Sequence, residues 1–328
     1  MSDDDDLLSP PSLRQRLGSK VRAALSVRAG ALVVGGLVLL IGLYYLLGAI
    51  WLDRIDDDLA LAPAAVPAGA SRAVAMAAVL VERETDIHFW IANDPFFLPG
   101  SLLDNMPNFQ QGILAALSRF AVEMTDQIGR TRGSSEADPD LNQAAGLLKY
   151  SGTVWLFDTS VSWLPTVSSE KQYRAARRAL LSYNERLAAG KATFERRADN
   201  LLATLDRVAA DLGSASAVIE RHLAEDAGSF LDWRADDVFY NTKGRLYAYF
   251  LLLRELGQDF APVLAEREMQ AAWAQTIEGL GRAAALRPWV VVNGTPDSQF
   301  LPSHLAAQGF YLLRARTQLR EITNILQK

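Results

Sequence analysis

Side chains suited to ligand binding are concentrated between His88 and Gly112. In this stretch aromatic residues alternate with carboxamides and carboxylates. Aromatic rings supply contact area to a bound peptide or polymer, and a few well-placed amides fix its orientation. Long irregular segments of a compact domain are also often functional. The candidate ligand- or partner-binding residues are Trp90, Asn93, Asp94, Phe96, Phe97, Asp104, Asn105, Asn108 and Gln111.

A structural role competes with binding for the same residues. The rings can fix the loop to the core, while Asn93, Asp94 and Asn105 cap turns or helices, which such residues favour. This structural interpretation is favoured. A third reading makes the region an envelope hydrolase, in which Asp94 or Asp104 serves as a partly buried acid in a deep cleft, as glycan cleavage requires.

A second polar cluster consists of Asn241, Lys243 and Arg245. We expect a helix to begin at Asn241, and helix starts attract capping side chains. Capping is therefore favoured over ligand binding for this cluster.

Other kinds of chemistry find little support. The chain has no cysteine, which excludes disulfides, thiolate catalysis and cysteine-ligated metals. Its three histidines, His88, His222 and His304, are scattered, so we expect no metal site and no cofactor. Without residues 1–28, which hold five basic and four acidic side chains, 28 basic and 34 acidic ones remain. A domain with this net negative charge is not expected to bind nucleic acid.

One segment is suited to cross a lipid bilayer. Residues 29–52 carry no charge and, as a helix, would span about 36 Å, enough for a hydrocarbon core of roughly 30 Å. Five basic residues precede the segment, whereas one basic residue, Arg54, and four acidic ones, Asp53 and Asp56 to Asp58, follow it. Lysine and arginine remain preferentially in the cytoplasm, so we expect residues 1–28 to be a cytoplasmic tail. A cleaved signal peptide would have a shorter apolar core.

The remaining chain is rich in strong helix formers and predicts an all-α domain over residues 71–328, after a tether at 53–70. Ser71 is a plausible N-cap of its first helix. Between Ser168 and Ala227 apolar residues recur every three or four positions, with a shift near Gly190. This spacing is typical of coiled-coil-like packing. It fits one long helix or a helical hairpin, and the continuous helix is slightly favoured.

Three strings carry a resemblance to a known family: WIANDPFF at 90–97, LDNMPNFQQG at 103–112 and RRADNL at 196–201. They resemble a proteobacterial family of single-pass inner-membrane proteins that is catalogued as a domain of unknown function. The resemblance implies a Gram-negative inner membrane and a periplasmic domain. It implies no activity and no catalytic residue.

Together these features predict a membrane-anchored helical bundle with one long ordered loop. We expect residues 29–52 to be the part of the chain that contacts the lipid bilayer. We expect a non-enzymatic interaction or scaffold module of the cell envelope, with a protein partner or self-association. The alternative is an envelope hydrolase, or a glycan- or peptide-binding protein, that uses the 88–112 region.

Overall fold

The computed structural model describes residues 13–128, 137–157, 163–226, 228 and 232–327. The acidic N-terminal stretch at residues 1–12 lies outside the described residues. The chain divides into two units, residues 1–50 and residues 51–328, and each is considered by itself.

The first unit consists mainly of the long helix α1 (Leu13–Leu52), which begins well before the apolar segment. Within α1, the 25-residue segment Arg28–Leu52 contains an 18-residue window with a mean hydropathy of 2.3. Among the described residues this is the one helix long and apolar enough to cross a membrane. By length and composition alone, a signal sequence would also meet this criterion.

The described part of the second unit contains helices and no named strand, which confirms the predicted all-α fold class. Its α-helices are α2 (Arg72–Glu82), α3 (Asn105–Glu123), α4 (Pro139–Leu148), α5 (Ser169–Ala188), α6 (Ala198–Asp226), α7 (Trp233–Asp259), α8 (Ala261–Glu266), α9 (Gln270–Ala284) and α10 (His304–Leu326). Shorter helical turns are η1 (Arg83–Ile87), η2 (Pro99–Leu102) and η3 (Met124–Ile128).

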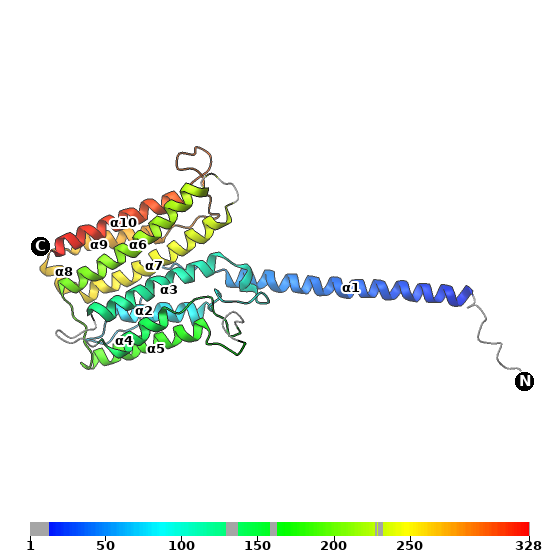
Figure 1. Ribbon diagram of the computed structural model, residues 1–328, viewed down its shortest axis with the longest axis horizontal. Coiled ribbons are helices and arrows are strands. Elements are labelled where there is room, and N and C mark those ends of the chain that lie inside the picture. Colours follow the sequence, from blue (N-terminus) through cyan, green and yellow to red (C-terminus); the bar gives the residue numbers. More distant parts are fainter. Residues whose placement is uncertain (1–12, 129–136, 158–162, 227, 229–231, 328) are drawn as a thin grey trace, which may run out of the picture. The chain divides into compact units, whose positions relative to one another are not determined.

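Helix α7 is the centre of this bundle (Figure 1). It packs against α3, α9 and α2, while α5 covers α2 and α4, and α6 pairs with α10. The middle of α7 is buried almost without interruption from Leu246 to Leu253. A helix buried around most of its circumference needs neighbours on every side. This explains why the eight-residue apolar run lies in the core.

The helix termini gather at two ends of the bundle. At one end, which we call the proximal end, the unit begins at Trp51, whose ring lies 5.8 Å from that of Phe89. The connections 88–104 and 149–168, in their described residues, meet there through Asn93, which donates to the Val154 carbonyl. The connection 285–303 lies at the same end, because Asn293 donates a hydrogen bond to Asp232, the N-cap of α7. The connections 189–197 and 260–269 form the opposite, distal end.

Several helix starts follow local sequence rules. Ser71 is the N-cap of α2, where its hydroxyl accepts the Val74 amide, as predicted. Helix α7 begins at Trp233, two turns before the predicted start at Asn241. Asp232 supplies the cap by accepting the amides of Arg234 and Ala235.

The slightly favoured continuous helix across residues 168–227 is wrong. Helix α5 ends at Ala188, and Gly190 adopts a positive φ of 70°, a conformation that favours glycine and ends a helix. The chain then folds back on the core, where Phe194 packs against Phe260. Helices α5 and α6 contact different partners, α2 and α4 for one and α10 and α3 for the other. The periodic spacing therefore reflects one buried face on α5 and another on α6, and each face packs against its own neighbouring helices.

Residues 53–70, predicted as a tether, lie within the second unit and run along α7. Arg254 donates to the carbonyls of Leu59 and Leu61. The carboxylate of Asp57 is buried, 2.6 Å from the ammonium of Lys243. Burial raises the pKa of Asp57, but hydrogen bonds from Arg287 and Lys243 outweigh it and hold the pKa below its usual value.

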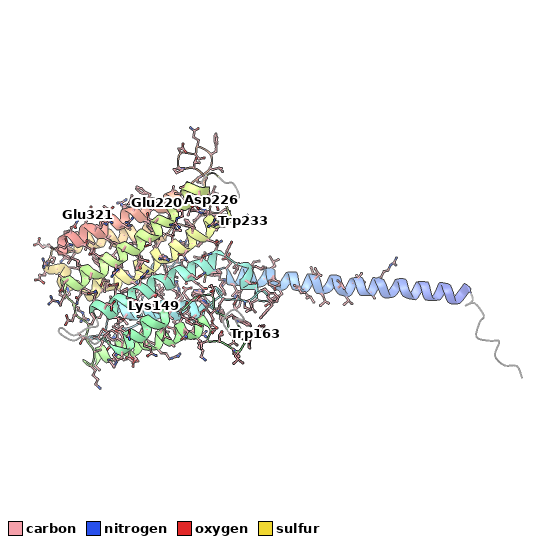
Figure 2. All side chains as sticks on the ribbon, in the orientation of Figure 1. Lys149, Trp163, Glu220, Asp226, Trp233 and Glu321 are labelled. Atoms are coloured by element: carbon pink, nitrogen blue, oxygen red, sulfur yellow. The ribbon has the colours of Figure 1, made fainter. Side chains whose placement is uncertain are left out.

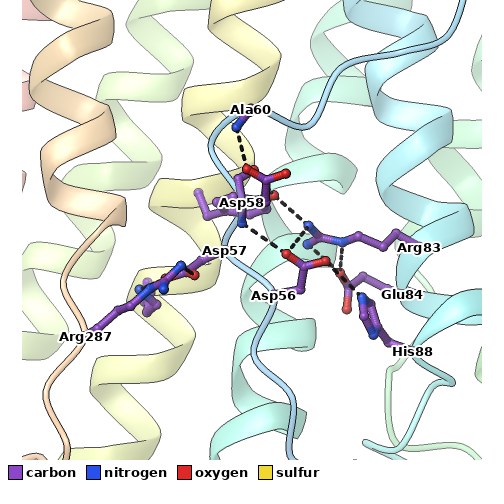
Figure 3. Close-up of polar contacts among 10 residues, drawn as sticks. Asp56, Asp57, Asp58, Ala60, Arg83, Glu84, His88 and Arg287 are labelled. Carbon is purple, nitrogen blue, oxygen red and sulfur yellow. Dashed lines mark hydrogen bonds and ion pairs between the residues drawn. The ribbon is translucent and has the colours of Figure 1, made fainter.

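Neighbouring acids complete this attachment (Figure 3). Asp56 lies 3.2 Å from His88 and faces Arg83, which in turn pairs with buried Glu84. The stretch that leaves α1 is therefore bound to the bundle by charged side chains.

Candidate ligand-binding groove

An uncovered face of α3 forms the floor of a polar hollow in the bundle. Gln111, Ala115, Ser118 and Val122 follow one another at helical spacing along this face. Ala115 and Ser118 are small, so helices α4 and α6 on either side leave a space of about 430 Å³. This is the size of a typical small-ligand site. We call it the α3 groove, lined by Trp90, Gln111, Leu114, Ala115, Ser118, Arg119, Val122, Leu148, Lys149, Tyr150, Gly152, Tyr173, Asp211 and Arg245.

One end of the α3 groove has fixed aromatic walls. The indole of Trp90 donates to the Gly152 carbonyl at 2.8 Å, and its ring meets that of Tyr173 edge to face at 5.0 Å. The Tyr173 hydroxyl donates to the Tyr150 carbonyl at 2.9 Å. Both rings are therefore held in place before any ligand arrives, which reduces the entropic cost of binding.

The charged lining centres on Asp211 of α6. Arg245 donates to both carboxylate oxygens of Asp211, at 3.0 and 3.1 Å, and the Tyr249 hydroxyl donates at 2.9 Å. Burial raises the pKa of Tyr249 well above its usual value, so the hydroxyl remains a donor. Arg119 lies farther away, its Nε 3.7 Å from the carboxylate. The groove is lined by three cationic side chains and one carboxylate, and its fixed charge is positive.

Two of the three cationic side chains, those of Arg119 and Lys149, are exposed. The Arg119 side chain is 71 % exposed, and Lys149, labelled in Figure 2, is exposed as well. An approaching anion can therefore reach both groups from solvent.

A second hollow of about 280 Å³ shares Arg245 with the α3 groove. It lies between α6 and α7, where Ser214 and Ala215 again leave room. Asn108 borders it and donates to Asp237 at 2.6 Å, while Asn241 accepts from the Arg245 guanidinium at 3.2 Å. Arg245 thus joins two adjoining hollows.

The structure brings together five of the residues predicted as candidates. Trp90 and Gln111 line the α3 groove, Asn108 and Asn241 line the second hollow, and Arg245 lines both. Asn241, Lys243 and Arg245 lie in the interior of α7, so the capping role expected for them is wrong. Lys243 faces away from both hollows and is buried against Asp57 and the carbonyls of Ala284 and Leu286.

The other loop candidates have separate surroundings. Asn93 bridges the Val154 carbonyl and the Glu170 carboxylate, which ties the loop to α5. Asp104 is the N-cap of α3 and Asn105 is its first residue, so the predicted loop ends before residue 112. Phe97 packs against Trp155, and Phe96 is exposed.

Asp94 stands apart from the other carboxylates. Burial, together with the nearby Glu170 charge, raises its pKa to about 6, although it accepts the Gly100 amide. Neither Asp94 nor Asp104 lines the α3 groove.

The groove residues that were not identified from the sequence include Arg119, Lys149, Tyr173 and Asp211. They come from α3, α5, α6 and the end of α4, and no short motif links them. One available signal was the run of small and polar residues along one face of α3, which a fully covered helix would not carry. Among the described residues, no three His, Cys, Asp or Glu side chains are arranged to hold a metal.

Fold and groove define a class of protein: an all-α domain, with an open polar groove, that follows one long apolar helix. The chain belongs to the family described as an uncharacterized protein conserved in bacteria (DUF2333), whose model matches residues 60–229 and 220–328. No curated protein matches the chain, and no solved structure does.

Proposed function

We propose that this protein is a membrane-anchored, non-enzymatic interaction module of the bacterial cell envelope. Residues 29–52 anchor it in the inner membrane, with the N-terminus in the cytoplasm and residues 71–328 in the periplasm. The apolar segment of α1, its basic flank and the bacterial family support this placement. The α3 groove binds an acidic segment of a partner protein.

The observation that carries this proposal is the sign of the groove's charge. The chain outside residues 1–28 has more acidic than basic side chains, yet Arg119, Lys149 and Arg245 line the groove against a single Asp211. A local charge opposite to that of the whole domain favours partners of complementary potential. Asp211 bonds Arg245 at 3.0 Å and lies 3.7 Å from the exposed Arg119, so Arg119 and Lys149 are the groups that an incoming carboxylate can reach.

The shape of the groove favours a polypeptide partner. Its floor is a helix face about three turns long, from Gln111 to Val122, with aromatic walls at one end. Helical segments commonly bind by laying one face into such a groove, with side chains three or four positions apart as anchors. An acidic amphipathic segment would place its apolar side chains on Ala115 and Val122 and its carboxylates at Arg119 and Lys149.

In-cell photo-crosslinking tests this proposal. A photoreactive amino acid replaces Ser118 in the full-length chain, and the control chain carries it at Glu321, on the exposed surface of α10 (Figure 2). We expect a discrete crosslinked polypeptide from position 118 only. Because Arg119 and Lys149 supply the attraction, the double substitution Arg119→Glu and Lys149→Glu should reduce that adduct about tenfold. Equal adducts at both positions, or an adduct insensitive to charge reversal, would contradict the proposal.

One observation favours the alternative, an envelope hydrolase. The half-buried Asp94, with its pKa raised to about 6 beside Glu170, has the protonation behaviour of a general acid. This reading predicts that the full-length chain releases soluble fragments from purified cell-wall glycan, and that Asp94→Asn abolishes the release. A chain that releases nothing from this substrate would count against it.

A further inference from the structure

Exposed aromatic side chains form a rim at the proximal end of the bundle. They come from connections far apart in sequence: 88–104, 149–168 in its described residues, the start of α7, and 285–303. Figure 2 shows Trp163 and Trp233 on this side of the second unit. We define the aromatic rim as Phe89 (48 % exposed), Phe96 (83 %), Trp163 (90 %), Trp233 (73 %), Trp289 (102 %) and Phe300 (92 %).

The distal end has no comparable feature in its described residues. In the connections 189–197 and 260–269 the large apolar side chains, such as Phe194, Phe260 and Met269, are buried. Single exposed hydrophobic residues are ordinary, but their concentration at one end marks an interaction surface. The asymmetry therefore identifies a face of the second unit that is suited to an apolar environment.

Chain connectivity indicates which environment this is. Trp51 lies at the end of the apolar segment of α1, and its ring packs against that of Phe89 of the rim, with 5.8 Å between the ring centroids. A bilayer that holds residues 29–52 must therefore lie within reach of Phe89. Aromatic rings are enriched at the boundary between lipid headgroups and acyl chains.

We propose that the aromatic rim inserts into the headgroup region of the membrane that holds residues 29–52, so that the second unit rests on the lipid surface. This inference depends on the proposed anchoring by α1. It adds an interaction surface to that anchoring and is independent of the α3 groove.

Charge at the proximal end determines the kind of lipid contact. Asp53, Asp104, Asp236 and Asp237 form an acidic cluster there, and burial together with the neighbouring acids raises the pKa of Asp236 to about 6. Anionic headgroups would be repelled by such a cluster. The rim therefore binds by apolar contact, and zwitterionic lipid suffices.

The absence of cysteine from the sequence makes a clean test available. Full-length single-cysteine variants Trp289→Cys, Trp163→Cys and Phe300→Cys, each at a highly exposed position, are labelled with a small fluorophore. They are reconstituted into phosphatidylcholine vesicles with or without nitroxide-labelled lipid. Lys191→Cys, at an exposed position of the distal connection 189–197, is the matched control. Leu39→Cys, within the apolar segment of α1, reports on anchoring.

We expect nitroxide lipid to quench the rim labels at least about threefold more than the label at position 191, because quenching requires contact with lipid. High salt should leave the difference unchanged. Quenching at position 39 without excess quenching at the rim overturns the rim proposal and leaves the anchoring intact. Absence of quenching at position 39 overturns the anchoring and the rim proposal together.

Discussion

At the scale of single residues, the surroundings of two carboxylates shift their pKa values in opposite directions. Asp57 is buried, but Lys243 and Arg287 donate to it, and its pKa lies below the usual value. Asp94 is half-buried beside another acid, Glu170, and its pKa rises to about 6. A partner of opposite charge favours the ionised form, whereas burial near a like charge disfavours it. Asp57 therefore secures the fold, and Asp94 titrates near neutrality.

The raised pKa of Asp94 predicts a pH-dependent effect of Asp94→Asn on stability. A group whose pKa is higher in the folded state than its usual 3.8 contributes stability that is fully present below 3.8 and is lost as the pH rises through about 6. Asparagine does not titrate and can still accept the Gly100 amide. We expect the variant to melt at a higher temperature than the wild type at pH 7.5. This advantage should disappear near pH 4, as measured by thermal unfolding in detergent. Equal shifts at both pH values would show that the carboxyl has an ordinary pKa.

At the scale of elements, the crossing of α3 and α7 depends on two glycines. A Cβ on Gly112 would lie 2.1 Å from the Asn241 carbonyl oxygen, and a Cβ on Gly244 equally close to that of Phe109. The two backbones are therefore in direct contact, which only glycine permits. This close approach places Gln111 of α3 and Arg245 of α7 side by side in the lining of the α3 groove.

Gly244→Ala should destabilise the chain strongly, because the added methyl group meets backbone atoms that cannot move aside. We expect a loss of about 3 kcal/mol, the upper range for overpacking a core. Gly146→Ala is the matched control, since its Cβ would meet nothing within 4 Å on α4. There alanine should stabilise the helix by about 0.5–1 kcal/mol. Denaturant unfolding measures the free energy of unfolding of both variants. If Gly244→Ala and Gly146→Ala change this free energy by a similar amount, the close crossing of α3 and α7 is refuted.

At the scale of the whole molecule, residues 51–61 decide how the proposed anchor joins the second unit. The stretch is fixed along α7 by Asp57, Arg254 and Tyr247, whose hydroxyl donates to the Asp58 carbonyl. A flexible linker would let the domain sample many positions, whereas an attached one limits its reach. The groove partner and the lipid surface are therefore both expected close to where the chain leaves the bilayer.

The proposed orientation predicts where the C-terminus lies. Alkaline phosphatase, which is active only outside the cytoplasm, is fused after Lys328 of the full-length chain. We expect active phosphatase, because the five basic residues before the apolar segment remain in the cytoplasm. A fluorescent protein that fails to fold after export serves as the complementary fusion and should be dark. A bright fusion together with inactive phosphatase would place the domain inside the cell.

The sequence alone determined the features that depend on local order. An uncharged stretch of 24 residues, an excess of helix formers and a serine before an apolar helix are each read within a few turns of chain. From them came the candidate membrane helix, the all-α fold class and the Ser71 cap. The resemblance to an uncharacterised bacterial family was also read from the sequence, and the family model that matches residues 60–229 and 220–328 confirms it.

Only the tertiary structure decided the groove, the separation of α5 from α6, and the burial of Lys243. The groove joins Trp90, Arg119, Lys149 and Asp211 across three helices and a loop, and a hollow exists only where packed neighbours fail to fill space. The helical spacing over residues 168–227 specifies buried faces but not the helices that bury them. Lys243 shows the same dependence, since its role as a buried partner follows from Asp57, 186 positions away in the chain. Local sequence sets which elements form, and long-range packing sets which side chains meet.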